Sequence, residues 1–152
     1  MKKIAFITST LLLAVIFTAC SRPGIERDGV DEAQLRAGAW TVDHVESNQY
    51  NNGVLTSSTW VQFGENEEGG ICTFTYTEDG RWIMNDNGEI YEFNYTMEEN
   101  IIETNGGGTW GVREMTDSYL EITLRGSEVS NPCQYNAEGA VYYLTRTAAT
   151  KQ

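Results

Sequence analysis

Residues 71–95, ICTFTYTEDGRWIMNDNGEIYEFNY, decide the fold, because they contain three alternating runs separated by two turn pairs. In the first run Cys72, Phe74 and Tyr76 share one face, while the threonines between them take the other. The turn pairs are Asp-Gly and Asn-Gly, which readily accept the positive φ angles of tight hairpins. Alternation of period two between such turns predicts antiparallel strands with one face in water.

The same alternation extends over most of the chain after residue 38. Before it, residues 31–37 predict one short helical turn, with Leu35 as its apolar contact and Gly38 as its stop. Beyond that turn, no segment of useful length has a 3.6-residue period. The predicted strands are 38–46, 58–64, 71–77, 81–85, 89–95, 100–104, 109–115, 119–125 and 140–147.

The number and spacing of these strands predict an all-β fold. Eight or nine short strands with hairpin turns and no crossover helix are typical of a sandwich or a barrel. We favour a small antiparallel up-and-down β-barrel, because closure removes the exposed edges that an open meander would leave. The length of 152 residues indicates one domain.

The first twenty residues predict export. Lys2 and Lys3 precede an uncharged stretch of 16 residues from Ile4 to Ala19, which is shorter than the ~20 residues of a spanning helix. A basic, then apolar, then small-residue order is that of a secretory signal. It ends in Phe-Thr-Ala-Cys20, which resembles the lipobox of bacterial lipoproteins, where cleavage precedes a lipidated cysteine. An ordinary signal peptide with a chance cysteine, or an uncleaved anchor, remains the alternative.

The lipobox resemblance divides the chain into four parts. These are a signal peptide over 1–19, the lipidated Cys20 with a flexible tether over 20–30, a barrel domain over 31–148, and a tail over 149–152. The resemblance implies a protein of the cell envelope held to the membrane by its N-terminal lipid. Ser21 is not an aspartate-type retention signal, so the resemblance further implies the outer membrane.

The charge excludes one class of partner. The whole chain has a formal charge of −12, and loss of residues 1–19 would leave 8 basic and 22 acidic residues, a charge of −14. Nucleic-acid binding needs a basic face, so we expect none. His44 has Asp43 and Glu46 nearby but no nucleophile motif, so we expect no enzyme and no cofactor. The acidic turn at 86–89 fails the calcium-loop pattern, which leaves no predicted metal site.

The cysteines offer a possible crosslink. With Cys20 taken by lipid, Cys72 and Cys133 remain as a pair in an oxidising compartment. A disulfide between them is the favoured interpretation, and two buried free thiols are the alternative.

Both ends of the predicted barrel resemble a known family. Leu35, Gly38 and Trp40 give L-x-x-G-x-W, which is similar to the opening of lipocalins. Residues 142–146, YYLTR, resemble the closing strand of the short bacterial lipocalin-like domains. The resemblance implies that Arg146 lies over Trp40 and closes the barrel, whereas the residues alone equally allow a solvated terminal charge.

Two functions from different classes follow. The first is uptake of a small hydrophobic or amphipathic ligand, which the resemblance implies, into a barrel lined by aromatic side chains; the alternative is that these rings form a solid core. The second is an acidic protein-interaction module that docks a cationic protein, such as a lysozyme-type hydrolase. The candidate lining residues are Trp60, Phe74, Tyr76, Trp82, Tyr91, Phe93, Tyr95, Trp110 and Tyr143.

Overall fold

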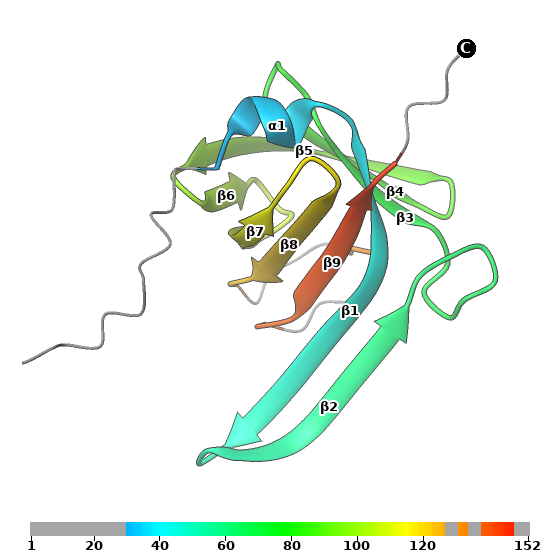
Figure 1. Cartoon of the computed structure of the whole chain (residues 1–152), viewed down its shortest axis with the longest axis vertical. Coiled ribbons are helices and arrows are strands. Elements are labelled where there is room, and N and C mark those ends of the chain that lie inside the picture. The colour runs from blue at the N-terminus through cyan, green and yellow to red at the C-terminus, as the bar shows by residue number, and fades with distance from the viewer. Residues whose placement is uncertain (1–29, 127–130, 134–137, 148–152) are drawn as a thin grey trace, which may run out of the picture.

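The computed structural model describes residues 30–126, 131–133 and 138–147 (Figure 1). The predicted signal peptide, Cys20, most of the tether and the predicted tail lie outside these ranges. Within them the regular structure is antiparallel sheet, apart from a single turn of helix. The elements are α1 (Glu32–Arg36), β1 (Ala39–Asn51), β2 (Val54–Gln62), β3 (Cys72–Tyr76), β4 (Arg81–Asp86), β5 (Glu89–Glu98), β6 (Ile101–Thr104), β7 (Thr109–Met115), β8 (Tyr119–Leu124) and β9 (Val141–Arg146).

The strands close into a barrel, which confirms the predicted fold class. The sheet order runs β2-β1-β3-β4-β5-β6-β7-β8-β9, and β1 also pairs with β9. Eight strands, β1 and β3 to β9, therefore form the barrel, and β2 is an additional strand. Strict alternation of buried and less buried residues in β3, β4 and β8 matches the predicted pattern of one inward face.

The β1–β2 hairpin extends beyond the barrel wall, as Figure 1 shows at the bottom of the view. β1 has 13 residues, and its second half pairs with β2 from His44↔Gln62 to Asn51↔Val54. The hairpin turns at Asn52 and Gly53, whose φ angles are 51° and 78°. The predicted strands 38–46 and 58–64 therefore miss the part of the hairpin nearest the turn. The first strand ends later, at Asn51, and the second begins earlier, at Val54, than predicted. β2 pairs only with the second half of β1, whereas Ala39 to Thr41 at the start of β1 pair with β3 in the barrel.

Helix α1 covers one end of the barrel. Asp31 caps the helix by accepting a hydrogen bond from the Ala33 N–H, and Leu35 is fully buried beneath it. The buried Trp40 indole donates to the Leu35 carbonyl at 2.9 Å. The Arg146 guanidinium carbon lies 4.3 Å from the Trp40 ring centre. This arrangement is the one that the lipocalin-like resemblance implies for these two residues.

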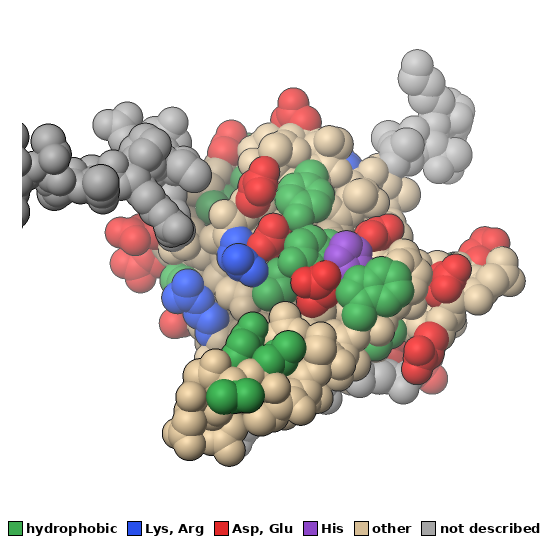
Figure 2. Space-filling model, turned by 60° about the horizontal axis from the view of Figure 1, so that its bottom comes forward, with side chains coloured by type: hydrophobic (Ala, Val, Ile, Leu, Met, Phe, Trp, Pro, Cys, Tyr) green, Lys and Arg blue, Asp and Glu red, His purple; other side chains and the backbone are tan. Residues whose placement is uncertain are grey.

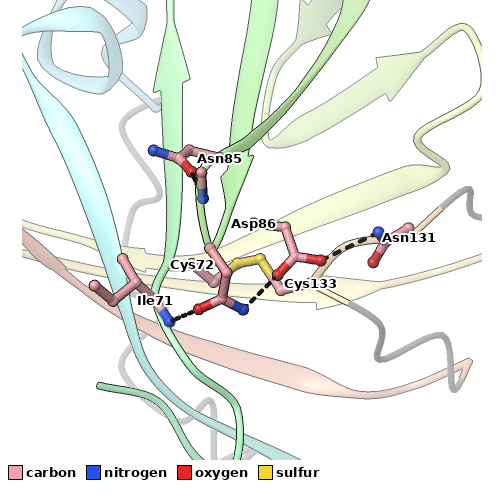
Figure 3. The surroundings of a disulfide bond; sticks show 8 residues. Ile71, Cys72, Asn85, Asp86, Asn131 and Cys133 are labelled. Atoms are coloured by element: carbon pink, nitrogen blue, oxygen red, sulfur yellow. Dashed lines mark hydrogen bonds between the residues drawn. A yellow bond between two sulfur atoms is a disulfide. The ribbon is translucent and has the colours of Figure 1, made fainter. Parts of the chain in front are cut away.

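A disulfide lies near the opposite end of the barrel (Figure 3). Cys72 at the start of β3 is bonded to Cys133, with their Cα atoms 5.8 Å apart. The disulfide prediction is therefore confirmed. Beside it the buried Asp86 carboxylate accepts hydrogen bonds from the Asn87 and Asn131 amides at 2.9 and 3.2 Å. The bridge and the Asn131 bond together hold residues 131–133 against β3 and β4.

Candidate functional site

Aromatic rings pack against one another through the barrel interior. Phe74, Trp82 and Trp110 are fully buried, with the Phe74 and Trp82 ring centres 5.1 Å apart and those of Trp82 and Trp110 5.6 Å apart. Tyr142 lies 4.9 Å from Trp110, and Tyr76 stacks on Trp82 with their ring centres 6.1 Å apart. These spacings are those of favourable aromatic pairs, so the rings form a continuous packed core.

Two donors in this core have no partner. Among the described residues, the Tyr76 hydroxyl and the Trp82 indole N–H are buried without a hydrogen bond. Burial raises the pKa of Tyr76 far above its ordinary value, so its hydroxyl stays protonated. Two buried donors without hydrogen bonds lower the stability of the fold locally. A small polar group placed beside them could accept hydrogen bonds from both.

Seven of the nine predicted lining residues belong to the core or pack against it. Five of them, Phe74, Tyr76, Trp82, Tyr95 and Trp110, are buried. Tyr91 and Phe93 are partly buried and pack against the core from β5, opposite Met84 and Trp82.

Trp60 and Tyr143 do not line the barrel, and the prediction for these two residues is wrong. Trp60 lies on β2 outside the barrel and is 56% exposed. On β9 the buried residues are Tyr142 and Leu144, so the alternation of the strand points Tyr143 outward.

The two outward rings meet at His44, on the outer face of β1. The His44 ring stacks on Tyr143 with ring centres 4.2 Å apart and planes 12° apart. The Trp60 ring centre lies 5.6 Å from His44 on the other side. Glu46 is the cross-strand neighbour of Trp60 and accepts a hydrogen bond from the Tyr143 hydroxyl at 3.2 Å. Glu121 of β8 lies opposite Tyr143 in the next strand pair.

We call these five residues, His44, Glu46, Trp60, Glu121 and Tyr143, the aromatic–acid patch. Figure 2 shows green and red side chains gathered around the chain's one histidine, drawn in purple. The patch crosses four adjacent strands, β2, β1, β9 and β8, because its members lie at facing positions of the register. Its side chains therefore occupy one continuous outer face.

The electrostatics of the patch are acidic. Burial, together with the Glu46 carboxylate, raises the pKa of Tyr143, so its hydroxyl remains a donor at neutral pH. Asp43 adds a third carboxylate, 2.7 Å from the His44 Nδ1. Arg113 lies 3.0 Å from Glu121 and is the cation paired with the patch among the described residues. Three carboxylates beside the exposed Trp60 ring and the half-buried Tyr143 ring make a surface that suits a cation.

A second acidic surface lies on the β5–β6 hairpin. A shallow hollow of about 540 Å³ is lined by Met97, Ile101 and three glutamates, Glu98, Glu99 and Glu103. It lacks an aromatic ring and is not part of the patch. In the part of the chain that the structure describes, no group of three His, Cys, Asp or Glu side chains is placed to hold a metal ion. The helix among the described residues is far too short to cross a bilayer.

The orientation of β9 could have been read from the sequence. Leu144 must face the core, and Tyr142 shares its face, so Tyr143 has to point outward. The Asn52-Gly53 pair likewise indicates the hairpin that carries Trp60. The contact of the Trp60 and Tyr143 rings with His44 could not be predicted. A bulge between Val42 and His44 shifts the register of β1 against β9.

The sequence matches no protein-family model, and neither the curated proteins nor the solved structures provide a match. The likeness to lipocalin-like domains therefore stays a prediction from short motifs, and the patch is interpreted from its own geometry.

Proposed function

We propose that this protein is a lipid-anchored interaction module that binds a cationic protein through the aromatic–acid patch. The observation that carries the proposal is the division of the aromatic side chains. The inward rings pack on one another in the core, whereas Trp60 and Tyr143 lie outside among carboxylates. A ligand entering the barrel would have to displace the packed rings, but a partner at the outer face would displace only water.

The chemistry of the patch favours a lysine or arginine side chain of the partner. A cation over the Trp60 ring gains a cation–π interaction, and Glu46 lies directly across the strand pair to neutralise it. The negative formal charge, −12 for the whole chain and −14 after loss of residues 1–19, attracts a cationic protein from a distance, which speeds its association at low salt. A lysozyme-type hydrolase is one basic protein of this kind.

The anchor belongs to the proposal as well. The lipobox-like sequence before Cys20 supports attachment to the outer membrane, and the residues between Cys20 and α1 supply a tether of up to ~35 Å. Two or three acyl chains would hold the barrel durably, whereas a chain of 22 acidic and 10 basic residues is repelled by anionic headgroups.

The test measures the affinity of the full chain for a basic lysozyme, with an acidic protein of similar size as the negative probe. We expect binding to the basic probe that weakens steeply with ionic strength. Glu46→Gln should lower the affinity about tenfold or more, because a desolvated charge pair loses one partner.

The matched control is Glu103→Gln, which changes the net charge equally but lies in the hollow on the β5–β6 hairpin. It should leave the affinity within about twofold. Equal losses in the two variants would mean that only net charge matters, and a larger loss in Glu103→Gln would place the docking site in the hollow. Either result would contradict the proposal.

A second candidate function is uptake of a small amphipathic molecule into the barrel. The unpartnered donors Tyr76 and Trp82 favour it, since a polar headgroup could accept their hydrogen bonds. Fluorescent lipophiles distinguish the two functions. Salt-insensitive uptake that is lost in Tyr76→Phe but retained in Glu46→Gln would support the lumen over the patch.

A further inference from the structure

Strand β2 has one free edge. In the described part of the chain it stands at the end of the sheet order and pairs with β1 alone. The Phe63 N–H donates a hydrogen bond to the Asp43 carbonyl at 2.8 Å. Every second residue of β2 before Phe63, starting with Val61, therefore also directs its backbone N–H and C=O groups toward β1. The backbone groups of Ser58 and Trp60 therefore point away from β1, toward the free edge, whereas the Gln62 carbonyl on the same side accepts a hydrogen bond from the Gly69 N–H at 2.9 Å.

This edge carries none of the usual protection against pairing. The nine residues of β2, VLTSSTWVQ, include no charged residue and no proline. No charged residue occurs anywhere between Glu46 and Glu65. Three of its side chains are large, apolar and exposed: Val54 at 65%, Leu55 at 51% and Trp60 at 56%. Edge strands that remain unpaired in natural proteins are usually blunted by charge, proline or shortness.

We propose that β2 pairs antiparallel with β2 of a second copy of this chain. The distribution of charge favours a second copy of this chain over a cationic partner at this edge. Two copies that each carry a formal charge of −12, or −14 after loss of residues 1–19, repel one another over most of their surfaces, and the uncharged hairpin is where they can approach. A cationic partner would instead be drawn to the carboxylates, which β2 lacks. A two-fold axis makes the contact self-complementary and closed, so that pairing stops at two copies.

The register follows from symmetry. A two-fold arrangement centred on Ser58, whose backbone groups point to the free edge, places Ser58 opposite Ser58 of the second copy. The irregularity of the β1–β2 ladder between Gln49 and Tyr50 leaves Thr56 without a facing residue on β1, so the pairing centred on Ser58 is regular from Ser57 to Thr59. The two-fold axis of an antiparallel pair stands perpendicular to the sheet. The two aromatic–acid patches therefore face the same way, and the dimer offers a cationic partner two adjacent sites.

Cysteine crosslinking in intact cells that express the full chain tests the pairing directly. Opposed residues at such a register have Cα atoms roughly 5.5 Å apart, which is within the reach of a disulfide. Ser58→Cys should give a covalent dimer under mild oxidation. The matched control, Thr145→Cys, is exposed on β9 but paired on both sides, by Thr41 and Tyr119, and should give none.

Sedimentation of the purified full chain in detergent provides the second readout. We expect the mass of two copies for the wild type and for Thr145→Lys, and the mass of one copy for Ser58→Lys, which sets two like charges opposite each other. A monomeric wild type would overturn the proposal. So would equal crosslinking of both cysteine variants, or a Ser58→Cys adduct with a different protein, which would assign the edge to a foreign strand.

Discussion

Replacing Trp82 and Trp60 by alanine separates a ring that holds the fold together from a ring that is free to bind. Trp82 is fully buried and lies against Phe74, Trp110 and Phe93, with ring centres 5.1, 5.6 and 5.4 Å away. A buried tryptophan removes 150–250 Å² from water, which at about 25 cal/mol/Å² stabilises the fold by about 4–6 kcal/mol. Removing its unpartnered indole N–H returns about 1–3 kcal/mol.

The net loss for Trp82→Ala is therefore about 3 kcal/mol, which corresponds to a fall in melting temperature of roughly 10 °C. Trp60 is 56% exposed, so Trp60→Ala should change the free energy of unfolding by less than about 1 kcal/mol. Thermal and urea unfolding followed by far-ultraviolet circular dichroism measures both variants without relying on tryptophan emission. Equal destabilisation by the two substitutions would refute the division into inner and outer rings.

Three further predictions concern the ends of the barrel and its tyrosines. The paired substitution Cys72→Ser with Cys133→Ser opens a link of sequence separation 61 and should cost about 4 kcal/mol in urea unfolding; an unchanged midpoint would contradict the role of the bridge. Arg146→Lys loses the planar stack on Trp40 and the 2.7 Å hydrogen bond to the Gln34 carbonyl, and should cost about 1 kcal/mol in the same assay, whereas no change would mean that Arg146 does not hold α1 in place. Burial raises the pKa of Tyr76, and burial together with the hydrogen bond to Glu121 raises the pKa of Tyr119. The stability that these two protonated hydroxyls contribute is therefore complete below about pH 10, and it is lost as the pH rises toward the pKa values of the folded state. In an alkaline titration the tyrosinate absorbance of these residues should therefore appear together with loss of the circular dichroism signal, and full ionisation of a folded chain near pH 10 would contradict this.

The sequence predicted the barrel because strand period and turn chemistry agree locally. The stretch from Cys72 to Tyr95 alternates with an Asp-Gly and an Asn-Gly turn, and each feature alone indicates a hairpin. The inward positions of Phe74 and Trp82 followed from this alternation. The disulfide could be proposed by elimination, but its geometry depended on a Cα separation that only the fold supplies.

The aromatic–acid patch could not be predicted in the same way. Its members come from strands far apart in sequence, and a bulge between Val42 and His44 sets which of them face one another. The prediction that Trp60 lines the barrel was wrong because a large aromatic residue in a strand was taken to face the barrel interior. The polar run around it, Thr56 to Thr59, in fact leaves that strand without an apolar face. Alternation within a strand indicates which side of the barrel wall a ring occupies, but only the register between strands determines which outward side chains meet at His44.

The four tryptophan indole N–H groups allow the most direct test of where the partner binds. Each gives its own resonance in a nitrogen-15 correlation spectrum of the full chain in detergent, and a basic lysozyme is titrated in at low salt. We predict that the Trp60 resonance shifts, while those of the buried Trp40, Trp82 and Trp110 stay in place. Shifts confined to Trp82 and Trp110, with Trp60 unmoved, would place the binding site inside the barrel and contradict the proposed function.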